Sequence, residues 1–205
     1  MLDALGRVLA LRDAVTAEHA RRVQRLAVVL AEDVCAGDDF LLGAIHAAAP
    51  LHDIGKLAIP DSVLHKPGPL TPDEYELVKR HAALGADILD GLEFGAPLAR
   101  IVRHHHENWD GTGYPDALGG HAIPLGARVL AVVDCYDALT SERPYREPLS
   151  HAAALEMIVA RRGTMYDPAI LDAFVRAVQR LRSCDAIVTR DFSSSRFPRQ
   201  KLRVI

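Results

Sequence analysis

A histidine and an aspartate stand side by side at His52-Asp53, followed by Ile54, Gly55 and Lys56. Neighbouring imidazole and carboxylate groups can bind one divalent metal ion together, or share two with the carboxylate as the bridge. Two-metal sites use a bridging hydroxide as the nucleophile on phosphorus, which indicates a hydrolytic centre. Lys56 would add a positive charge for a phosphate oxygen. The pair alone is weak evidence, because a capped helix end with a solvated lysine contains the same residue types.

Further ligand-type residues fall on the apolar faces of predicted helices. His19 shares a helical face with Val23 and Ala27, and His81 shares one with Val78 and Gly85. Several inward-facing imidazoles and carboxylates would be costly to bury without a common partner, and divalent cations supply one. Imidazole and carboxylate ligands without a convincing thiolate favour iron, manganese, nickel or zinc. The set comprises His19, His52, Asp53, His81, His105, His106 and Asp134.

Helical signals recur along the chain, and we find no alternating β pattern before residue 185. We expect one helix to run to Gly55 and another to pass from Thr71 through His81 to Ile88. The sequence therefore predicts an all-α protein. The expected helix starts are Thr16, Asp38 or Asp39, Thr71 with Pro72 and Glu74, Ser150, and Asp167-Pro168.

Composition sets the class of protein. With 205 residues, 49% of them hydrophobic and 25% charged, the chain can bury the core of one globular domain. We expect this domain to span residues 1–182 and a basic C-terminal tail to span 183–205. The net charge of -3 indicates no nucleic acid polymer as a partner, and no apolar run approaches the ~18 residues of a membrane span. Three widely spaced cysteines and the absence of a signal peptide favour a cytoplasmic protein without a membrane partner.

The order of the ligand-type residues resembles that of a known family. His19, His52-Asp53 and Asp134 repeat the order found in the HD metal-dependent phosphohydrolases. The segment HHENWDGTGYP at 105–115 resembles the signature of the HD-GYP subfamily, which hydrolyses the bacterial second messenger cyclic di-GMP. The resemblance begins at Arg12 and continues through DALT at 137–140 and RPYR at 143–146 to Asp167-Pro168. It implies a single globular HD-type bundle of about seven helices with a metal centre in the core.

The resemblance also implies roles for individual residues. Asp53 would bridge the metals and, with Lys56, be catalytic. Lys56, Arg143 and Arg146 would contact substrate phosphates, while Gly113 and Tyr114 would shape one wall of the substrate site or a docking surface. Two roles rest on position instead: Asp137, one helical turn after Asp134, would be an orienting hydrogen-bond partner, and His104, out of register with the family pair, would have a supporting or solvated role. The implied metal ligands are His19, His52, Asp53, His81, His105, His106 and Asp134.

One position departs from the family pattern and bears on the metal count. Family members with three metals carry a glutamate one helical turn before the first histidine, where this chain has Val15. Glu18 points elsewhere on the helix and is a poor substitute. We therefore expect two divalent metal ions, with iron or manganese favoured and nickel or zinc as alternatives.

Two classes of function stay open. The first is a phosphodiesterase that cleaves cyclic di-GMP to the linear dinucleotide pGpG, with GMP as a further product left open. The second is a binding module that senses the dinucleotide or docks diguanylate cyclase (GGDEF-type) domains through the surface around Tyr114. All the expected ligand positions are filled, which favours the enzyme. A third possibility is a metal-dependent hydrolase whose substrate is another cyclic dinucleotide or a nucleotide monophosphate. In the family this domain is usually joined to a sensor domain. Two interpretations stay open: the protein works alone or with a signalling partner, or this chain is an excised catalytic piece.

Overall fold

Helices account for the regular structure of the part of the chain that the computed structural model describes, which is residues 1–205 without 13, 94, 143–146 and 192–205. The side chains of residues 3, 10, 12–17 and 182–191 are also outside this description. Apart from the helices, only two isolated β-bridges occur in the described segments. The predicted all-α class is confirmed.

The α-helices are α1 (Leu2–Arg12), α2 (Ala14–Val34), α3 (Asp39–Ala48), α4 (Asp61–Leu64), α5 (Pro72–Lys79), α6 (His81–Asp90), α7 (Ala96–Arg103), α8 (Leu125–Thr140), α9 (His151–Val159) and α10 (Pro168–Asp191). The 3-10 helices are η1 (Ala49–Leu51), η2 (Ile54–Ala58) and η3 (Gly120–Ala122).

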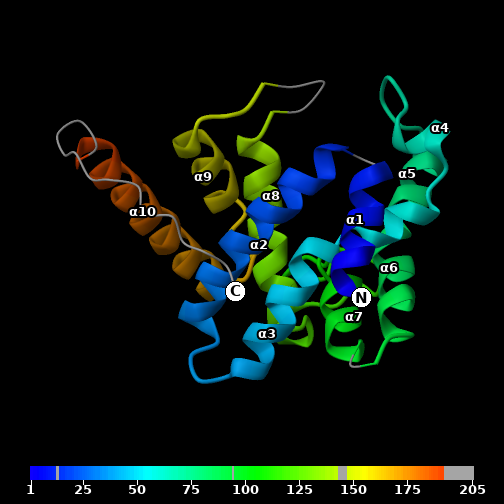
Figure 1. Ribbon diagram of the computed structural model, residues 1–205, viewed down its shortest axis with the longest axis horizontal. Helices are drawn as coiled ribbons and strands as arrows, with labels where there is room; N and C mark the ends of the chain where they lie inside the picture. Colours follow the sequence, from blue (N-terminus) through cyan, green and yellow to red (C-terminus); the bar gives the residue numbers. More distant parts are fainter. Residues whose placement is uncertain (13, 94, 143–146, 192–205) are drawn as a thin grey trace, which may run out of the picture.

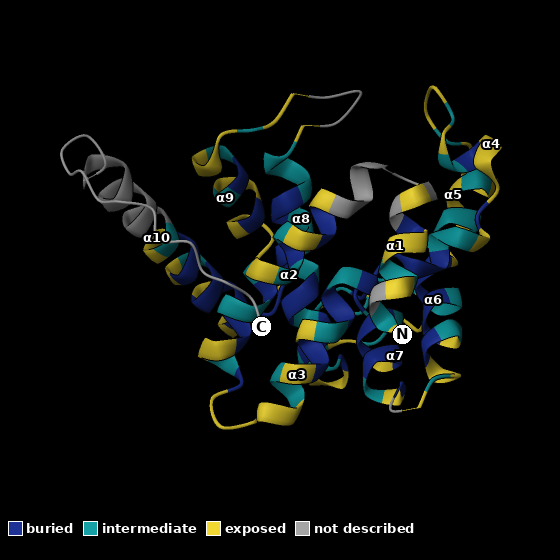
Figure 2. Ribbon diagram, in the orientation of Figure 1, coloured by how far each residue is buried: buried dark blue, intermediate teal, exposed yellow. Residues whose placement is uncertain are grey.

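Helices α2 and α8 run through the middle of the molecule (Figure 1). Helices α1 and α4 to α7 lie on one side of this pair, and α9 and α10 lie on the other. Figure 2 shows the buried positions of these helices facing inward. Helix α2 buries Val23, Ala27 and Leu30, one helical turn apart, and α8 buries Val129 and Val133 in the same way. Because His19 precedes Val23 by one turn, the face that forms the core also carries His19 inward.

Several predicted helix starts are confirmed by hydrogen bonds. The side chain of Asp38 accepts from the backbone N–H of Leu41 at 2.9 Å. Thr71 and Glu74 form the reciprocal capping box, in which each side chain accepts from the other residue's backbone N–H. The hydroxyl of Ser150 accepts from the backbone N–H of Ala153. These helix starts could be predicted from the sequence because a cap depends only on residues within one turn.

Other helix boundaries were predicted wrongly. Helix α2 begins at Ala14, so Thr16 lies inside the helix and is not its cap. Helix α1 was missed, although Leu2, Leu5 and Leu9 follow helical spacing and contact the core. The segment expected as one helix from Thr71 to Ile88 is divided into α5 and α6 at Arg80.

The segment with His52-Asp53 also differs from the prediction. Helix α3 ends at Ala48, and the pair lies in a turn between η1 and η2 instead of at the end of a continuous α-helix. Pro50 explains the change, because proline has no N–H to donate to the carbonyl one turn earlier. The turn leaves both side chains buried, with His52 2% and Asp53 6% exposed.

Gly55 fixes the position of this turn against α6. A Cβ atom built on Gly55 would overlap the carbonyl oxygen of His81 and the backbone nitrogen of Gly85. Only a glycine lets η2 and α6 approach backbone to backbone in this way. The close approach places Asp53 beside His81 and so joins two of the predicted ligand segments.

The helices give no indication of a membrane span. None of the helices within the described residues combines the length and the low polarity that crossing a bilayer requires. Helix α10 continues past residue 183, where we expected the tail to begin, and ends at Asp191.

Candidate metal centre

The first group of ligand-type side chains comes from three separate parts of the chain. His19 lies on α2, His52 in the turn before η2, and Asp134 on α8. The Nε2 atom of His19 is 3.2 Å from Oδ1 of Asp134 and 3.4 Å from Nε2 of His52. The Nε2 atom of His52 is 3.6 Å from the same oxygen of Asp134. We call His19, His52 and Asp134 the first cluster; their ligand atoms lie within 4.8 Å of one another.

The second group contains three imidazoles. His81 begins α6, while His105 and His106 lie in the turn after α7. The Nε2 atoms of His81 and His105 are 3.4 Å apart, and the ring of His106 lies 4.0 Å from that of His105 and 5.0 Å from that of His81. We call His81, His105 and His106 the second cluster; one ligand atom from each lies within 4.8 Å of the others.

Asp53 faces both clusters. Its Oδ2 atom is 3.5 Å from Nε2 of His52 in the first cluster, and its Oδ1 atom is 3.5 Å from Nε2 of His81 in the second. Lys56 donates to Oδ2 at 2.6 Å. A carboxylate with one oxygen toward each of two ligand groups has the arrangement of a metal bridge. The charge of Lys56 keeps this buried carboxylate ionised: burial would raise the pKa of Asp53, but Lys56, His52 and His81 lower it well below its usual value.

The orientation of the imidazoles fits metal binding. The Nδ1 atoms of His52, His81 and His105 each contact the backbone carbonyl three residues earlier, at 2.6 to 2.7 Å. A carbonyl only accepts, so each Nδ1 carries a hydrogen, and each ring in its neutral form presents the Nε2 lone pair to its cluster. The Nε2 lone pairs of His81 and His105 face each other at 3.4 Å and repel unless a cation lies near both. The donor set therefore suits divalent metal ions, and the fixed tautomers are the usual second layer of support for histidine ligands.

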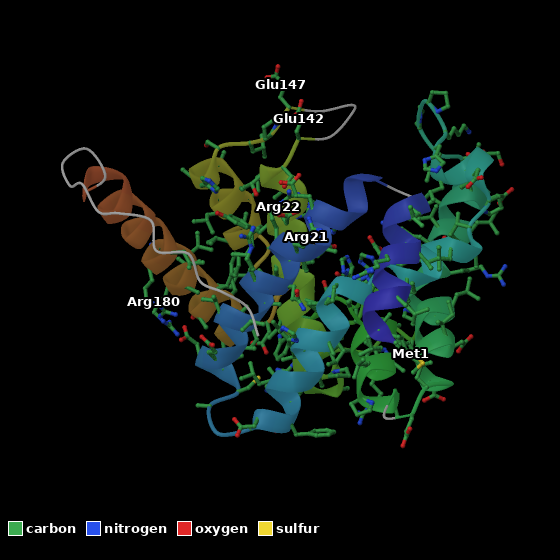
Figure 3. The ribbon with its side chains drawn as sticks, in the orientation of Figure 1. Met1, Arg21, Arg22, Glu142, Glu147 and Arg180 are labelled. Atoms are coloured by element: carbon green, nitrogen blue, oxygen red, sulfur yellow. The ribbon has the colours of Figure 1, made fainter. Side chains whose placement is uncertain are left out.

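His19 is oriented by a carboxylate instead of a carbonyl. Its Nδ1 donates to Oδ2 of Asp137 at 2.7 Å, so the structure shows the hydrogen bond that an orienting role of Asp137 requires. Arg22 donates to both oxygens of Asp137 at 2.6 and 3.0 Å. Arg22 is labelled in Figure 3, on α2 beside α8, one turn after His19. The pKa of Asp137 would be raised by burial, but His19 and Arg22 hold it below its usual value.

The carboxylates make the first cluster basic in the absence of metal. Burial alone would lower the pKa of His19, but its hydrogen bonds to Asp134 and Asp137 and the charge of Asp134 outweigh burial and raise it to about 9. The pKa of His52 is likewise raised by Asp53 and Asp134 against the opposing effect of burial. Asp134 is the acidic partner: burial would raise its pKa, and hydrogen bonds from His19 and His52 lower it well below its usual value. A proton therefore occupies this cluster where a cation would bind.

The second cluster has the opposite character. Burial, followed by the neighbouring His81, lowers the pKa of His106 to about 4. Burial and the neighbouring imidazoles lower the pKa of His105 well below its usual value. The pKa of His81 is also lowered, mainly by burial, with Asp53 opposing part of the effect. These rings are neutral at pH 7 and can accept a metal without first releasing a proton.

The loop that follows His106 packs against the second cluster. The ring of Tyr114 lies 4.9 Å from the ring of His106, and the backbone N–H of Tyr114 donates to the His106 carbonyl at 3.2 Å. Gly113 is needed for this path, because a Cβ atom built there would overlap the backbone of Glu107 and Asn108. Tyr114 thus forms a wall beside the centre, while contact of Gly113 or Tyr114 with substrate remains a prediction.

A buried glutamate that we did not single out in the sequence holds this loop. The carboxylate of Glu107, whose side chain is fully buried, accepts from the backbone N–H groups of Asp116 at 2.8 Å and Leu118 at 3.2 Å. Arg103 donates to both carboxylate oxygens of Asp116. His104 lies with Glu107 and Asp116 instead of with either cluster, and its supporting or solvated role stays a prediction. These contacts join residues up to thirteen apart, so helical or strand periodicity gave no signal for them.

Several predicted residues lie outside the described part of the chain. Arg143 and Arg146 fall in the undescribed segment 143–146, whose ends are marked by Glu142 and Glu147 in Figure 3. Val15 belongs to α2, but its side chain is not described. Glu18 is described: its side chain is 80% exposed and pairs with Arg22 at 3.5 Å, so it points away from the first cluster as expected.

Sequence comparison with known proteins identifies relatives of this chain. The sequence profile of the HD domain family matches residues 3–170. The chain is 46% identical over 177 residues to the cyclic di-GMP phosphodiesterase response regulator RpfG of Xanthomonas campestris pv. campestris, covering 85% of this chain and 47% of that protein. It is 35% identical over 181 residues to the 3'3'-cGAMP-specific phosphodiesterase 3 of Vibrio cholerae, covering 88% of this chain and 39% of the relative. The chain thus spans less than half the length of these two relatives.

A solved structure shares the fold. The HDG"Y"P protein Bd1817 from Bdellovibrio bacteriovorus superposes with a TM-score of 0.64 at 19% sequence identity, covering 87% of this chain and 62% of that one. At this identity the likeness concerns the fold alone.

Proposed function

The chain belongs to the HD domain family, and from this premise we propose that it is a metal-dependent phosphodiesterase that cleaves cyclic di-GMP to pGpG. The observation that carries the proposal is Asp53, whose two oxygens each lie 3.5 Å from an imidazole of a different cluster. Relatives named as cyclic di-GMP phosphodiesterases, at 40% to 46% identity, support the choice of substrate. Whether pGpG is cut further to GMP is part of the same test.

We assign two divalent ions to the centre, with Asp53 as their shared ligand. The first cluster would hold one ion and the second cluster the other; iron or manganese is favoured by the imidazole-rich set, with nickel and zinc as alternatives. When bound, such ions supply Lewis acid catalysis for phosphodiester hydrolysis. The ligand sets of the two ions would differ, because the first contains Asp134 and the second contains imidazoles only, apart from Asp53.

The chain's own residues would bind and neutralise the substrate phosphate. Lys56 lies at the centre, with its side chain 25% exposed and its ammonium 2.6 Å from Asp53. It can therefore donate to a phosphate oxygen that approaches Asp53, and stabilise charge that develops there. We assign the same role to Arg143 and Arg146. Tyr114 and the loop through Gly113 would exclude water on the side of the second cluster.

Two alternatives are supported by particular observations. The relationship to a 3'3'-cGAMP-specific phosphodiesterase supports a second cyclic dinucleotide as substrate. The partial exposure of Tyr114 supports a surface that docks a diguanylate cyclase (GGDEF-type) domain, with or without turnover. We also propose a cytoplasmic location, with which the lack of a disulfide at Cys35 and Cys135 in the described part of the chain agrees.

The decisive experiment combines metal analysis with turnover. Protein purified without oxygen should contain two metal ions per chain and convert cyclic di-GMP to pGpG. Chromatography of the products would measure the conversion. Parallel reactions with 3'3'-cGAMP would rank the substrates by kcat/KM. Removal of the metal by a chelator should abolish turnover, and added iron or manganese should restore it. Tight binding of cyclic di-GMP by metal-loaded protein without any product would show a binding module instead of an enzyme.

A further inference from the structure

Helix α5 places a lysine and a tyrosine beside the wall formed by Tyr114. The ammonium of Lys79 lies 5.0 Å from the ring centre of Tyr75 and 5.6 Å from that of Tyr114. Tyr75 is 49% exposed, so its ring is accessible to a ligand. Lys79 is held in place by Glu76, whose carboxylate accepts from it at 2.6 Å. Two aromatic rings thus flank one ordered cation.

This group is connected to the metal centre through Tyr114. The ring centre of Tyr114 lies 4.9 Å from that of His106 and 5.6 Å from the ammonium of Lys79, so Tyr114 is close to both the second cluster and α5. The electrostatic surroundings of the Tyr114 hydroxyl agree: its pKa is raised first by burial, then by Tyr75 on α5 and by Asp53 in the centre. A ligand that reaches Asp53 along the Tyr114 wall therefore also reaches Lys79 and Tyr75.

We propose that Tyr75 and Lys79 form a second subsite, which binds the nucleotide of a cyclic dinucleotide whose phosphodiester is not being cleaved. The inference rests on the proposed function. A cyclic dinucleotide carries two phosphates and two bases on one ring, so when one phosphate is at Asp53 the other half must lie against a wall of the site. Lys79 offers the positive charge for the second phosphate, and Tyr75 offers a ring on which the second base stacks.

The chemistry of this subsite predicts its selectivity. Stacking on a tyrosine tolerates any base, because every base has a π-face. Tyr75 should therefore strengthen binding of guanine and adenine nucleotides alike, and the subsite should not distinguish cyclic di-GMP from 3'3'-cGAMP. The contribution of Lys79 is electrostatic and partly exposed, so it should weaken as salt is added.

The test measures steady-state kinetics of metal-loaded Tyr75→Ala and Lys79→Met with cyclic di-GMP and 3'3'-cGAMP. Tyr75→Ala should raise KM on the order of tenfold for both substrates, because the ring on which the base stacks is lost. Lys79→Met should raise KM roughly threefold at low salt and less at high salt. In both variants kcat should change less than KM, because neither residue contacts the reacting phosphate. Tyr75→Phe, which keeps the ring, should restore the KM of the unaltered protein.

Two controls separate this inference from other effects. Phe40→Ala removes a 73% exposed aromatic ring on α3 and should leave KM unchanged, which excludes a general effect of losing surface apolar area. Methyl p-nitrophenyl phosphate has one phosphodiester and no second nucleotide, so its hydrolysis should be equal in all variants. If Tyr75→Ala slows this small substrate as well, the residue supports the fold of the centre and the subsite is wrong.

The remaining outcomes distinguish the two proposals. Unaltered protein that cleaves the small diester but neither cyclic dinucleotide would overturn the proposed function. Unaltered protein that cleaves cyclic di-GMP, with KM unchanged in Tyr75→Ala and Lys79→Met, would overturn the subsite alone.

Discussion

The two clusters use the same imidazole chemistry in opposite electrostatic settings. In the first, Asp134 and Asp137 both hydrogen-bond His19 and raise its pKa to about 9. In the second, three imidazoles face one another without a carboxylate of their own, and the pKa of His106 falls to about 4. Burial lowers the pKa of the imidazoles in both clusters. The difference therefore comes from the number of carboxylates that contact each cluster.

This contrast shows how each cluster is prepared for a cation. The second cluster is neutral and desolvated, so it offers free lone pairs but little negative charge. The first cluster carries negative charge that a proton neutralises until a metal replaces it. Within the described residues, Asp53 is the carboxylate that lies 3.5 Å from both His52 and His81, and it gives the second cluster a carboxylate contact.

Replacing Asp53 with alanine should have the largest effect, because it removes the carboxylate that both clusters share. We expect loss of at least one metal ion per chain and a fall in turnover on the order of a thousandfold or more. The helical content, measured by circular dichroism, should survive because the core is apolar. Metal content by mass spectrometry and cyclic di-GMP turnover check the prediction. A variant that keeps both metals and a near-normal rate would refute the shared centre.

Metal affinity should depend on pH differently at the two clusters. His19 holds a proton at pH 7 in the metal-free protein, so metal binding at the first cluster must release it. Affinity there should rise roughly a hundredfold between pH 7 and 9, or tenfold per unit for one proton. At the second cluster the pKa of His106 is about 4, so its ring is already neutral and the metal affinity should be constant between pH 7 and 9. Calorimetric titration with metal, in buffers of different ionisation enthalpy, counts the protons released. Equal proton release by both equivalents of metal would contradict the contrast.

The stability of the metal-free protein should follow the same signs. The raised pKa of His19 stabilises the fold below about pH 6.5, and this stability is lost as pH rises through 9. The lowered pKa of His106 has the opposite sign, so its contribution is present above about pH 6.5 and is lost as pH falls toward 4. Together the two histidines favour a stability maximum between these limits, which thermal unfolding of chelator-treated protein would show.

Replacing Lys56 with alanine should separate catalysis from metal binding. Lys56 contacts the oxygen of Asp53 that faces the first cluster, but it is not a ligand type for metals. We expect two metals to remain and kcat to fall roughly tenfold to a hundredfold, because charge near the phosphate is lost. Lys66→Ala is a matched control, since Lys66 forms a similar ion pair with Glu74 at the cap of α5. Loss of metal in Lys56→Ala would show that the lysine holds Asp53 in place instead.

The parts of this centre that were predictable from sequence are those with local or ordered signals. Helix caps at Asp38, Thr71 and Ser150 depend on residues within one turn, and the order of histidines and aspartates matched a family. The break at Pro50 and the division at Arg80 were missed because an apolar helical pattern continues across both. Helical spacing in a sequence can show that a polar side chain faces the core, but it does not show which group that side chain will bind.

Glu107 illustrates this limit, because its carboxylate binds backbone N–H groups nine and eleven residues later. Backbone donors leave no mark in the sequence, so neither partner could be identified in advance. Asp137 was easier to interpret, since it follows Asp134 by one helical turn and must lie on the same face. Its second partner, Arg22, lies on another helix and was visible only in the structure.

Asp137→Asn should produce the smallest effect and should reduce the contrast between the clusters. Asparagine keeps the size of the side chain but removes the charge that raises the pKa of His19 and pairs with Arg22. The pKa of His19 should fall, and the pH dependence of metal binding at the first cluster should become shallower. Metal affinity there should drop about tenfold, as expected when the group that orients a histidine ligand is changed. The second cluster should be unaffected, and competition with a chelating dye would measure both sites. Asp172→Asn, which disrupts an exposed ion pair with Arg162, is the control. An equal loss of affinity at both clusters would show that Asp137 supports the whole centre and not the first cluster alone.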